Sequence, residues 1–156
     1  MAEYVLAEYG GRGVVVYDEV SVGTSMIGKA RRVDLLVHLP ATAQALAIEC
    51  KWQDSSGTAD EKIPYALQDL EQMRMPALLV YAGSGFSPGV LHLLQSSAFA
   101  VYCLPEESLA PCRRRRDDPV DVGTWQLDHA LAQAFGWWDV LVAHKQPLAP
   151  GPRPAP

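Results

Sequence analysis

The first half of the chain has a pattern of apolar and polar positions that predicts one short helix and three strands. Residues 2–9 carry apolar side chains at helical spacing and end at Gly10-Gly11, a pair that stops a helix. Three segments rich in β-branched and other apolar residues follow, at positions 14–17, 33–37 and 45–51. Turns that contain Gly, Ser or Pro separate these segments, so we expect a three-stranded meander.

The second half alternates between helical and strand-like segments. Residues 59–73 place apolar side chains at intervals of three and four, which predicts an amphipathic helix with a boundary or kink at Pro64. A strand is expected at 77–81, a helix that starts at Ser87-Pro88, and another strand at 99–103. From Thr124 onward, Leu127, Leu131, Phe135 and Trp138 recur at helical spacing, which predicts one last helix.

These elements together predict an α/β fold. A helix, a meander and two helical crossovers that suit parallel pairing give three α/β/α layers around a central mixed sheet. With 156 residues and 17.0 kDa the chain has the size of one domain, which we expect at residues 1–145. The tail 146–156 contains five prolines and no aromatic residue, which predicts disorder.

The charge changes this picture only locally. A net charge of -5 and a pI near 5.3 argue against a protein that holds nucleic acid by a global positive field. The positive residues are grouped, however, and local clusters can attract phosphate where the mean charge does not. The groups consist of Lys29, Arg31 and Arg32, then Lys51 and Lys62, and finally the block Arg113 to Arg116.

The cysteines and the N-terminus predict a soluble, cytoplasmic protein. Cys50, Cys103 and Cys112 are scattered and form no CxxC pair, so we expect reduced structural thiols. The start Met1-Ala-Glu-Tyr4 lacks the basic and apolar regions of a secretory signal, and no apolar run is long enough to cross a membrane.

Polar residues on the second and third predicted strands are the candidates for chemistry. Because side chains alternate across a strand, Glu49, Lys51 and Gln53 share one face if the third strand extends that far. Asp34 interrupts the apolar second strand, and a carboxylate there is costly to bury unless it is paired or bound to a cation. A hairpin can bring Asp34 beside Glu49, so two carboxylates and a lysine converge.

Such a cluster suits metal-dependent hydrolysis at phosphorus. Mg²⁺ binds one or two carboxylates plus water and phosphate oxygens, so Asp34 and Glu49, with the backbone carbonyl of Cys50, form a partial shell. Lys51 would stabilise the charge that grows on the phosphoryl group or orient the attacking water. The alternative is a surface ion-pair cluster on an exposed sheet face, without chemistry.

The stretch Val33-Asp34, a spacer and Glu49-Cys50-Lys51 resembles the D...ExK signature of the PD-(D/E)xK, restriction-endonuclease-like nuclease superfamily. The predicted element order resembles that fold over roughly residues 3–82. The resemblance implies a restriction-endonuclease-like fold, with Asp34, Glu49 and Lys51 as catalytic residues and Mg²⁺ or Mn²⁺ as cofactor. Val33 stands where the family has a proline before the aspartate.

Gln53 extends the resemblance to the ExKxQ form of phage nucleases and Holliday junction resolvases. By that resemblance Gln53 joins the catalytic set, and a glutamate of the first helix joins the metal ligands. Glu8, ahead of Glu3, is the candidate for this role, although both are also ordinary residues of a solvated helix.

Nucleic acid would be held by the residues around this cluster. The candidates are Lys29, Arg31 and Arg32 before it and Lys62 and Tyr65 after it. The block Arg113 to Arg116 is a further candidate for phosphate contact, but a charge run between turn residues is more often solvated. The glycines of 83–89 do not fit a nucleotide-binding loop.

The function expected from the sequence is divalent-metal-dependent hydrolysis of DNA by a small endonuclease that uses an activated water. One domain offers one active site, so we expect a homodimer or higher oligomer. The alternative is a non-catalytic nucleic-acid-binding or assembly subunit with a nuclease-like fold. A third possibility is action on RNA or branched DNA, because the chemistry at phosphorus is shared.

Overall fold

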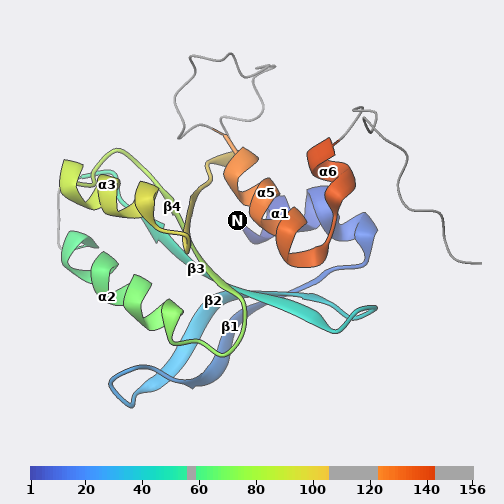
Figure 1. Ribbon diagram of the computed structural model, residues 1–156, viewed down its shortest axis with the longest axis horizontal. Coiled ribbons are helices and arrows are strands. Elements are labelled where there is room, and N and C mark those ends of the chain that lie inside the picture. Colours follow the sequence, from blue (N-terminus) through green and yellow to red (C-terminus); the bar gives the residue numbers. More distant parts are fainter. Residues whose placement is uncertain (56–58, 106–122, 143–156) are drawn as a thin grey trace, which may run out of the picture.

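A five-stranded sheet lies between two layers of helices in the computed structural model of the chain (Figure 1), which describes residues 1–55, 59–105 and 123–142. The strands follow chain order across the sheet. They are β1 (Val15–Thr24), β2 (Ala30–Leu39), β3 (Gln44–Trp52), β4 (Ala77–Ala82) and β5 (Ala100–Tyr102). The first three strands are antiparallel neighbours, whereas β3, β4 and β5 run parallel. The predicted three-layer α/β/α fold with a mixed sheet is therefore confirmed.

The helices are divided between the two faces of the sheet (Figure 1). One face carries α1 (Ala2–Tyr9), α5 (Trp125–Phe135) and α6 (Trp138–Val142), and α1 continues into the single turn η1 (Gly10–Arg12). The other face carries the crossover helices α2 (Ala59–Glu71) and α3 (Pro88–Ser96). Ser87 caps α3 with its hydroxyl and Pro88 opens it, as the sequence predicts. Within the described ranges, no helix is both long and apolar enough to cross a membrane.

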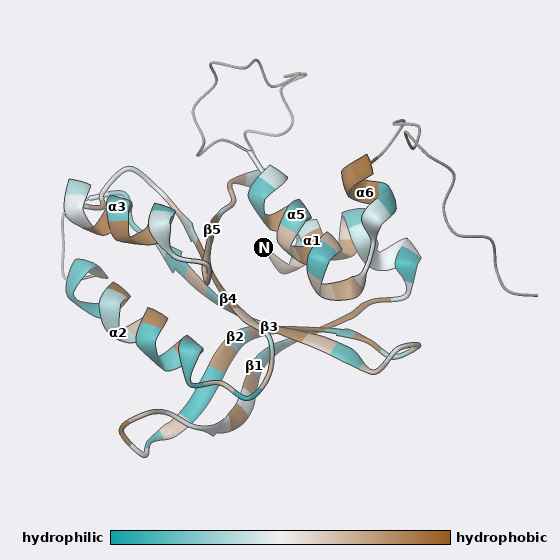
Figure 2. Cartoon of the chain, in the orientation of Figure 1, coloured by the Kyte–Doolittle hydropathy of each residue, from teal (hydrophilic) through white to brown (hydrophobic). Residues whose placement is uncertain are grey.

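Two hydrophobic cores hold the layers together. Under α1 and α5, the strand residues Val37 and Ile48 pack with Val5 and Leu131. Under α2 and α3, strand residues such as Leu79 pack with a separate set of helix side chains. In Figure 2 hydrophobic positions run along the central strands, and the hydrophilic positions of α2 lie on its outer side. The sheet is thus buried on both faces, which explains the nearly continuous apolar run of β4.

Two predicted helix boundaries differ from the structure. The helix α2 runs through Pro64, so a boundary there is wrong, whereas the alternative of a kink at Pro64 stays a prediction. The burial of Ile63, Leu67 and Leu70 on its apolar face offsets the backbone hydrogen bond that a proline inside a helix cannot donate. The last predicted helix is two helices, because Gly136 adopts a left-handed conformation with φ 71° and ends α5 before Trp138. The block Arg113 to Arg116 and the tail 146–156 lie outside the described residues.

The side chains of β1 and β2 change faces at one level of the sheet. Val16 and its partner Val37 pack toward α1 and α5, but Val20 and its partner Val33 pack toward α2 and α3. If side chains alternated between the two faces without interruption along β1 and β2, all four valines would lie on one face of the sheet. The change occurs at Glu19, whose φ of 50° is unusual for a residue with a side chain. Asp34 lies at the same level of β2.

Candidate active site

Asp34 lies where β2 separates from β3. The antiparallel pairing of these strands ends at Leu35 and Ile48, and one further step in the same register would place Asp34 opposite Glu49. Asp34 Oδ2 accepts a hydrogen bond from the backbone N–H of Cys50 at 2.6 Å. The carboxylate therefore replaces the β2 backbone carbonyl that would accept the hydrogen bond of Cys50 N–H if the pairing of the two strands continued. Beyond this point β3 pairs with β4 alone, and its polar residues Glu49 and Lys51 lie where β2 no longer pairs with it.

Glu49 and Lys51 project from the same face of β3. Their side chains form an ion pair, with 2.5 Å between Lys51 Nζ and Glu49 Oε1. Both are partly buried, with about a quarter of each side chain exposed. Cys50 projects to the opposite face, where burial and the neighbouring Asp34 raise the pKa of its thiol to about 11. Cys50 thus stays protonated at neutral pH, and only its backbone can contribute to a site for a hard cation.

A cavity of about 430 Å³ lies between the Glu49–Lys51 pair, the β1–β2 turn and α2. We call it the basic cavity, because five cationic side chains and two carboxylates line it among the described residues. The cationic residues are Lys29, Arg31, Arg32, Lys51 and Lys62. Glu49 and Tyr65 also line it, so the cavity brings the predicted catalytic residues Glu49 and Lys51 together with the residues predicted for nucleic-acid contact on either side of them. Asp34 is not among the residues that line the cavity. This concentration of charge in a chain of net charge -5 produces a locally positive surface.

Arg31 shapes the basic cavity through a buried ion pair with Asp69 of α2. Its Nε and Nη2 donate to Asp69 at 2.6–2.8 Å, and only 8% of the Arg31 side chain is exposed. Asp69 also accepts from the backbone N–H of Met26, in the β1–β2 turn. The hydrogen bonds from Arg31 lower the pKa of Asp69 and raise that of Arg31. Arg31 therefore ties the turn to α2, whereas Lys29 and Lys62 are exposed.

The structure does not bring Gln53 into the basic cavity. β3 ends at Trp52, and the Gln53 side chain is 6% exposed. Its Nε2 donates to the carbonyl of Gly85 at 2.8 Å and to Asp60 at 3.2 Å. Hydrogen bonds from Ser87, and then from Gln53, lower the pKa of Asp60. Gln53 thus braces the loop after β4, and its catalytic role stays a prediction.

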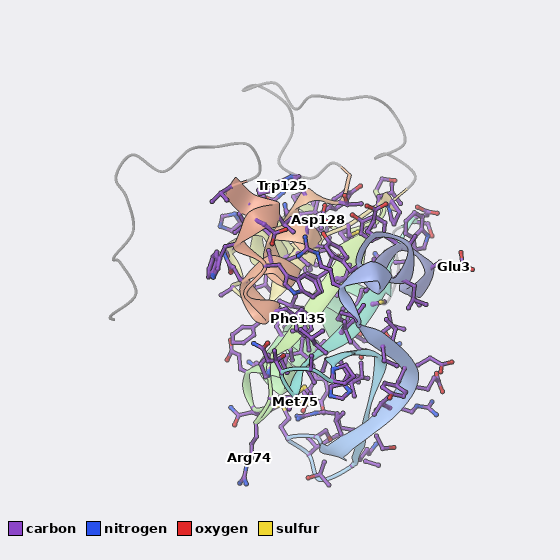
Figure 3. The ribbon with its side chains drawn as sticks, turned by 90° about the vertical axis from the view of Figure 1, so that its right-hand side faces the viewer. Glu3, Arg74, Met75, Trp125, Asp128 and Phe135 are labelled. Atoms are coloured by element: carbon purple, nitrogen blue, oxygen red, sulfur yellow. The ribbon has the colours of Figure 1, made fainter. Side chains whose placement is uncertain are left out.

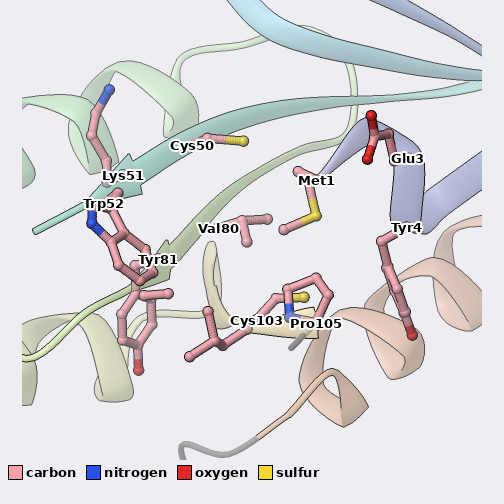
Figure 4. A pocket seen from close by; sticks show the side chains of 12 residues that line it. Met1, Glu3, Tyr4, Cys50, Lys51, Trp52, Val80, Tyr81, Cys103 and Pro105 are labelled. Carbon is pink, nitrogen blue, oxygen red and sulfur yellow. The ribbon is translucent and has the colours of Figure 1, made fainter. Parts of the chain in front are cut away.

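A second cavity of about 490 Å³ lies on the opposite face of β3, below the first turn of α1 (Figure 4). We call it the Trp52 cavity. Lys51 lines both cavities, so the two flank one end of β3. Trp52 was missed by the sequence reasoning, although an aromatic residue directly after the motif lysine was a usable signal. Of the two candidate helix glutamates, Glu3 lines the Trp52 cavity, whereas Glu8 lines neither cavity.

The wall that α1 contributes is fixed by Asp128 of α5 (Figure 3). Its Oδ1 accepts from the hydroxyls of Tyr4 at 2.6 Å and Tyr9 at 2.7 Å, and its Oδ2 accepts from Thr124 at 2.9 Å. Burial and these hydrogen bonds raise the pKa of both tyrosines, which stay neutral donors. The first turn of α1, with Glu3, is thereby held over the end of β3.

The place where β2 and β3 separate, which we call the fork, offers oxygen donors that suit a hard divalent cation. In the part of the chain that the structure describes, no group of three or more His, Cys, Asp or Glu side chains converges on a potential metal position. Asp34 and Glu49 provide two carboxylates on neighbouring strands, and the Cys50 backbone runs between them. Mg²⁺ is usually bound through one or two carboxylates, with water and phosphate oxygens completing the shell. The residues present fit that requirement.

Comparison with known proteins adds one finding. A family model for the PD-(D/E)XK nuclease superfamily domain matches residues 1–138. No curated protein and no solved structure matches the chain. The matched range includes every strand and all of α1, α2, α3 and α5.

Proposed function

The chain belongs to the PD-(D/E)XK nuclease superfamily, and from this premise we propose that it hydrolyses phosphodiester bonds of DNA with the help of a divalent metal ion. The observation that carries the proposal is the fork between β2 and β3. There Asp34 is anchored to the N–H of Cys50, the residue between Glu49 and Lys51, and the Glu49–Lys51 pair lines the basic cavity. Carboxylates, an ammonium group and a positively charged cavity are the components that this chemistry needs.

Asp34, Glu49 and the Cys50 carbonyl are the groups that would hold Mg²⁺ or Mn²⁺. When bound, the ion would polarise a phosphoryl oxygen and lower the pKa of a water molecule to the range in which it can attack phosphorus. Asp34 is already oriented by its bond from Cys50 N. Glu49 is oriented by Lys51, which holds its carboxylate within the cavity.

Lys51 has a second task in the proposed reaction. Its ammonium group reaches the basic cavity, where it can donate to a phosphate oxygen as negative charge grows in the transition state. The cationic residues around it, above all the exposed Lys29 and Lys62, would hold the backbone of the substrate. Action as a homodimer or higher oligomer remains part of the proposal, because one chain carries one such site.

The test is cleavage of supercoiled plasmid, single-stranded DNA and a four-way junction in Mg²⁺, Mn²⁺ or EDTA. We expect metal-dependent cutting by the natural chain and a loss of about 10²- to 10³-fold in Lys51→Ala, the size of losing one transition-state donor. Glu49→Gln and Asp34→Asn should also lose activity and bind Mn²⁺ more weakly. RNA of the same sequence tests whether the site distinguishes deoxyribose from ribose in the substrate backbone.

Matched controls separate chemistry from charge and folding. Arg74→Ala removes a positive charge and Glu71→Gln a carboxylate, and both residues are exposed and line neither cavity. These variants should keep full activity, and circular dichroism should show all variants folded. Cutting that persists in Lys51→Ala and in Glu49→Gln would refute the proposed site.

A non-catalytic assembly subunit is the alternative that one observation favours. The Lys51 ammonium is already paired with Glu49, so these two side chains have a partner without any metal ion or phosphate. Nucleic-acid binding that is unchanged in Lys51→Ala, together with no cutting of any substrate, would support this alternative.

A further inference from the structure

Lys51 and Trp52 lie side by side at the end of β3 and project to opposite faces of the sheet. Lys51 reaches the basic cavity, and the indole of Trp52 forms one end of the Trp52 cavity. Figure 4 shows Trp52 and Glu3 at opposite ends of this cavity, with Met1 and Val80 between them. A nucleic-acid strand that crosses the end of β3 would therefore contact both cavities within a very short length.

The two cavities differ in the chemistry that they can bind. The basic cavity gathers cationic side chains, which suits phosphate. Among the described residues that line the Trp52 cavity, Lys51 and the amino group of Met1 are positively charged, and Glu3 adds a negative charge at the far end. The rest of its wall is mostly apolar and aromatic. A flat ring with N–H donors would find an apolar wall and a carboxylate acceptor there.

Trp52 has the properties of a stacking platform. Its side chain is 58% exposed, which is unusual for so large an apolar group next to a buried strand. Its Nε1 donates to Asp54 Oδ2 at 3.0 Å, so the ring is oriented although it is not covered. An oriented, exposed indole pays little conformational entropy when a base stacks on it. Stacking on aromatic side chains is a common way to hold unpaired bases.

We propose that the Trp52 cavity binds an unpaired nucleobase next to the phosphate held at Lys51, with the base stacked on Trp52 and its N–H edge toward Glu3. The inference rests on the proposed nuclease function and narrows its substrate class. A base can reach this cavity only when it has left the helical stack, which is least costly in single strands, flaps and frayed ends. The preferred substrates are therefore strands with an unpaired nucleotide at the scissile position.

The experiment measures binding of the full chain in EDTA, so that it does not depend on hydrolysis. A labelled single-stranded oligonucleotide is compared with a series in which one abasic site is moved along the strand. For the natural chain we expect one short window of positions at which the abasic site weakens binding about 5- to 150-fold, the range for loss of one stacked base. Trp52→Ala should weaken binding of the intact strand equally and remove the abasic effect, and Trp52→Phe should restore most of both.

Trp138→Ala is the matched control, because Trp138 is also 58% exposed but lines neither cavity. It should bind like the natural chain. An abasic penalty that is unchanged in Trp52→Ala would overturn the base-binding proposal while leaving the nuclease proposal intact. Loss of the penalty in Trp52→Ala, without cutting of any DNA in Mg²⁺, would support base binding and refute the nuclease. No binding of any strand would overturn both.

Discussion

At the scale of single residues, the cations of the basic cavity differ in what they are available to do. Arg31 is bound to Asp69 and Lys51 to Glu49, and Arg32 forms an exposed pair with Glu19 that contributes little to stability. Lys62 has no ion pair within the described residues, and its side chain is exposed. The sequence predicted correctly that these cations lie together. It could not distinguish cations that are held in an ion pair, such as Arg31, from cations that are free to contact phosphate, such as Lys62. That distinction depends on Asp69, which lies almost forty positions from Arg31.

Lys62→Ala should weaken nucleic-acid binding through the loss of one phosphate contact. Each neutralised phosphate releases counterions, so the slope of log K against log salt should fall by about 1 in magnitude, or about 0.7 on single strands. Fluorescence anisotropy over a salt series measures this slope. Arg74→Ala, which removes an exposed charge outside the cavities, should leave it unchanged. An equal change of slope in both variants would mean that only net charge matters.

Asp69→Asn tests the structural role of the Arg31 pair. The lost charge-assisted hydrogen bonds should lower the free energy of unfolding by about 1.5–3 kcal/mol at neutral pH. Because Arg31 holds the pKa of Asp69 below its ordinary 3.8 in the folded chain, this stabilisation is complete above that value. It is lost as the pH falls through the lower folded-state pKa. In urea unfolding at several pH values, the difference in free energy of unfolding between the natural chain and Asp69→Asn should therefore shrink below about pH 4. A difference that stays constant with pH would contradict the role assigned to the Arg31–Asp69 pair.

At the scale of elements, the site residues on β2 and β3 were predictable and those just beyond were not. Alternation along β3 places Glu49 and Lys51 together, and the same rule extended by two residues placed Gln53 with them. The rule fails at Gln53 because β3 ends at Trp52 and the chain turns toward Gly85. The change of faces at Glu19 and Asp34 was also beyond the sequence pattern, because a left-handed glutamate has no signature comparable to glycine.

The turn after β3 depends on two glycines of the next loop. A Cβ on Gly85 would lie 2.6 Å from the carbonyl oxygen of Ser55, and one on Gly83 would meet the backbone of Gln53. We expect Gly85→Ala to lower the free energy of unfolding by about 1–3 kcal/mol, because backbone atoms must move apart. Gly89→Ala is the matched control, since a Cβ there meets nothing within 4 Å and lies in α3. It should be neutral or stabilising by up to about 1 kcal/mol. Equal melting temperatures for the two variants would contradict this account of the loop.

At the scale of the whole molecule, the two ends of the described chain combine to complete one face. Helix α1 comes first in sequence and α5 more than a hundred residues later, yet both cover the same side of the sheet (Figure 1). Helical periodicity predicted both helices, but nothing local in either segment predicts that they meet. Asp128 makes the connection, and Tyr9 stacks on Trp137 beside it, with 5.2 Å between ring centroids. This long-range contact fixes Tyr4, which lines the Trp52 cavity together with Glu3.

Asp128→Ala should therefore affect the fold and the Trp52 cavity together. Two tyrosine hydroxyls and Thr124 would lose their charged acceptor, so the free energy of unfolding should fall by at least about 1.5–3 kcal/mol, the range for one such bond. Hydrogen exchange should then show faster opening of α1 than of β3 and β4, which keep their neighbours. Asp128→Asn retains one carbonyl acceptor and should lose less than Asp128→Ala. If base stacking at Trp52 requires the wall that α1 forms, the abasic penalty in binding should shrink in Asp128→Ala while the salt slope set by the basic cavity is retained. A parallel loss of both would mean that the two cavities are not separable, and that α1 supports the active site as a whole.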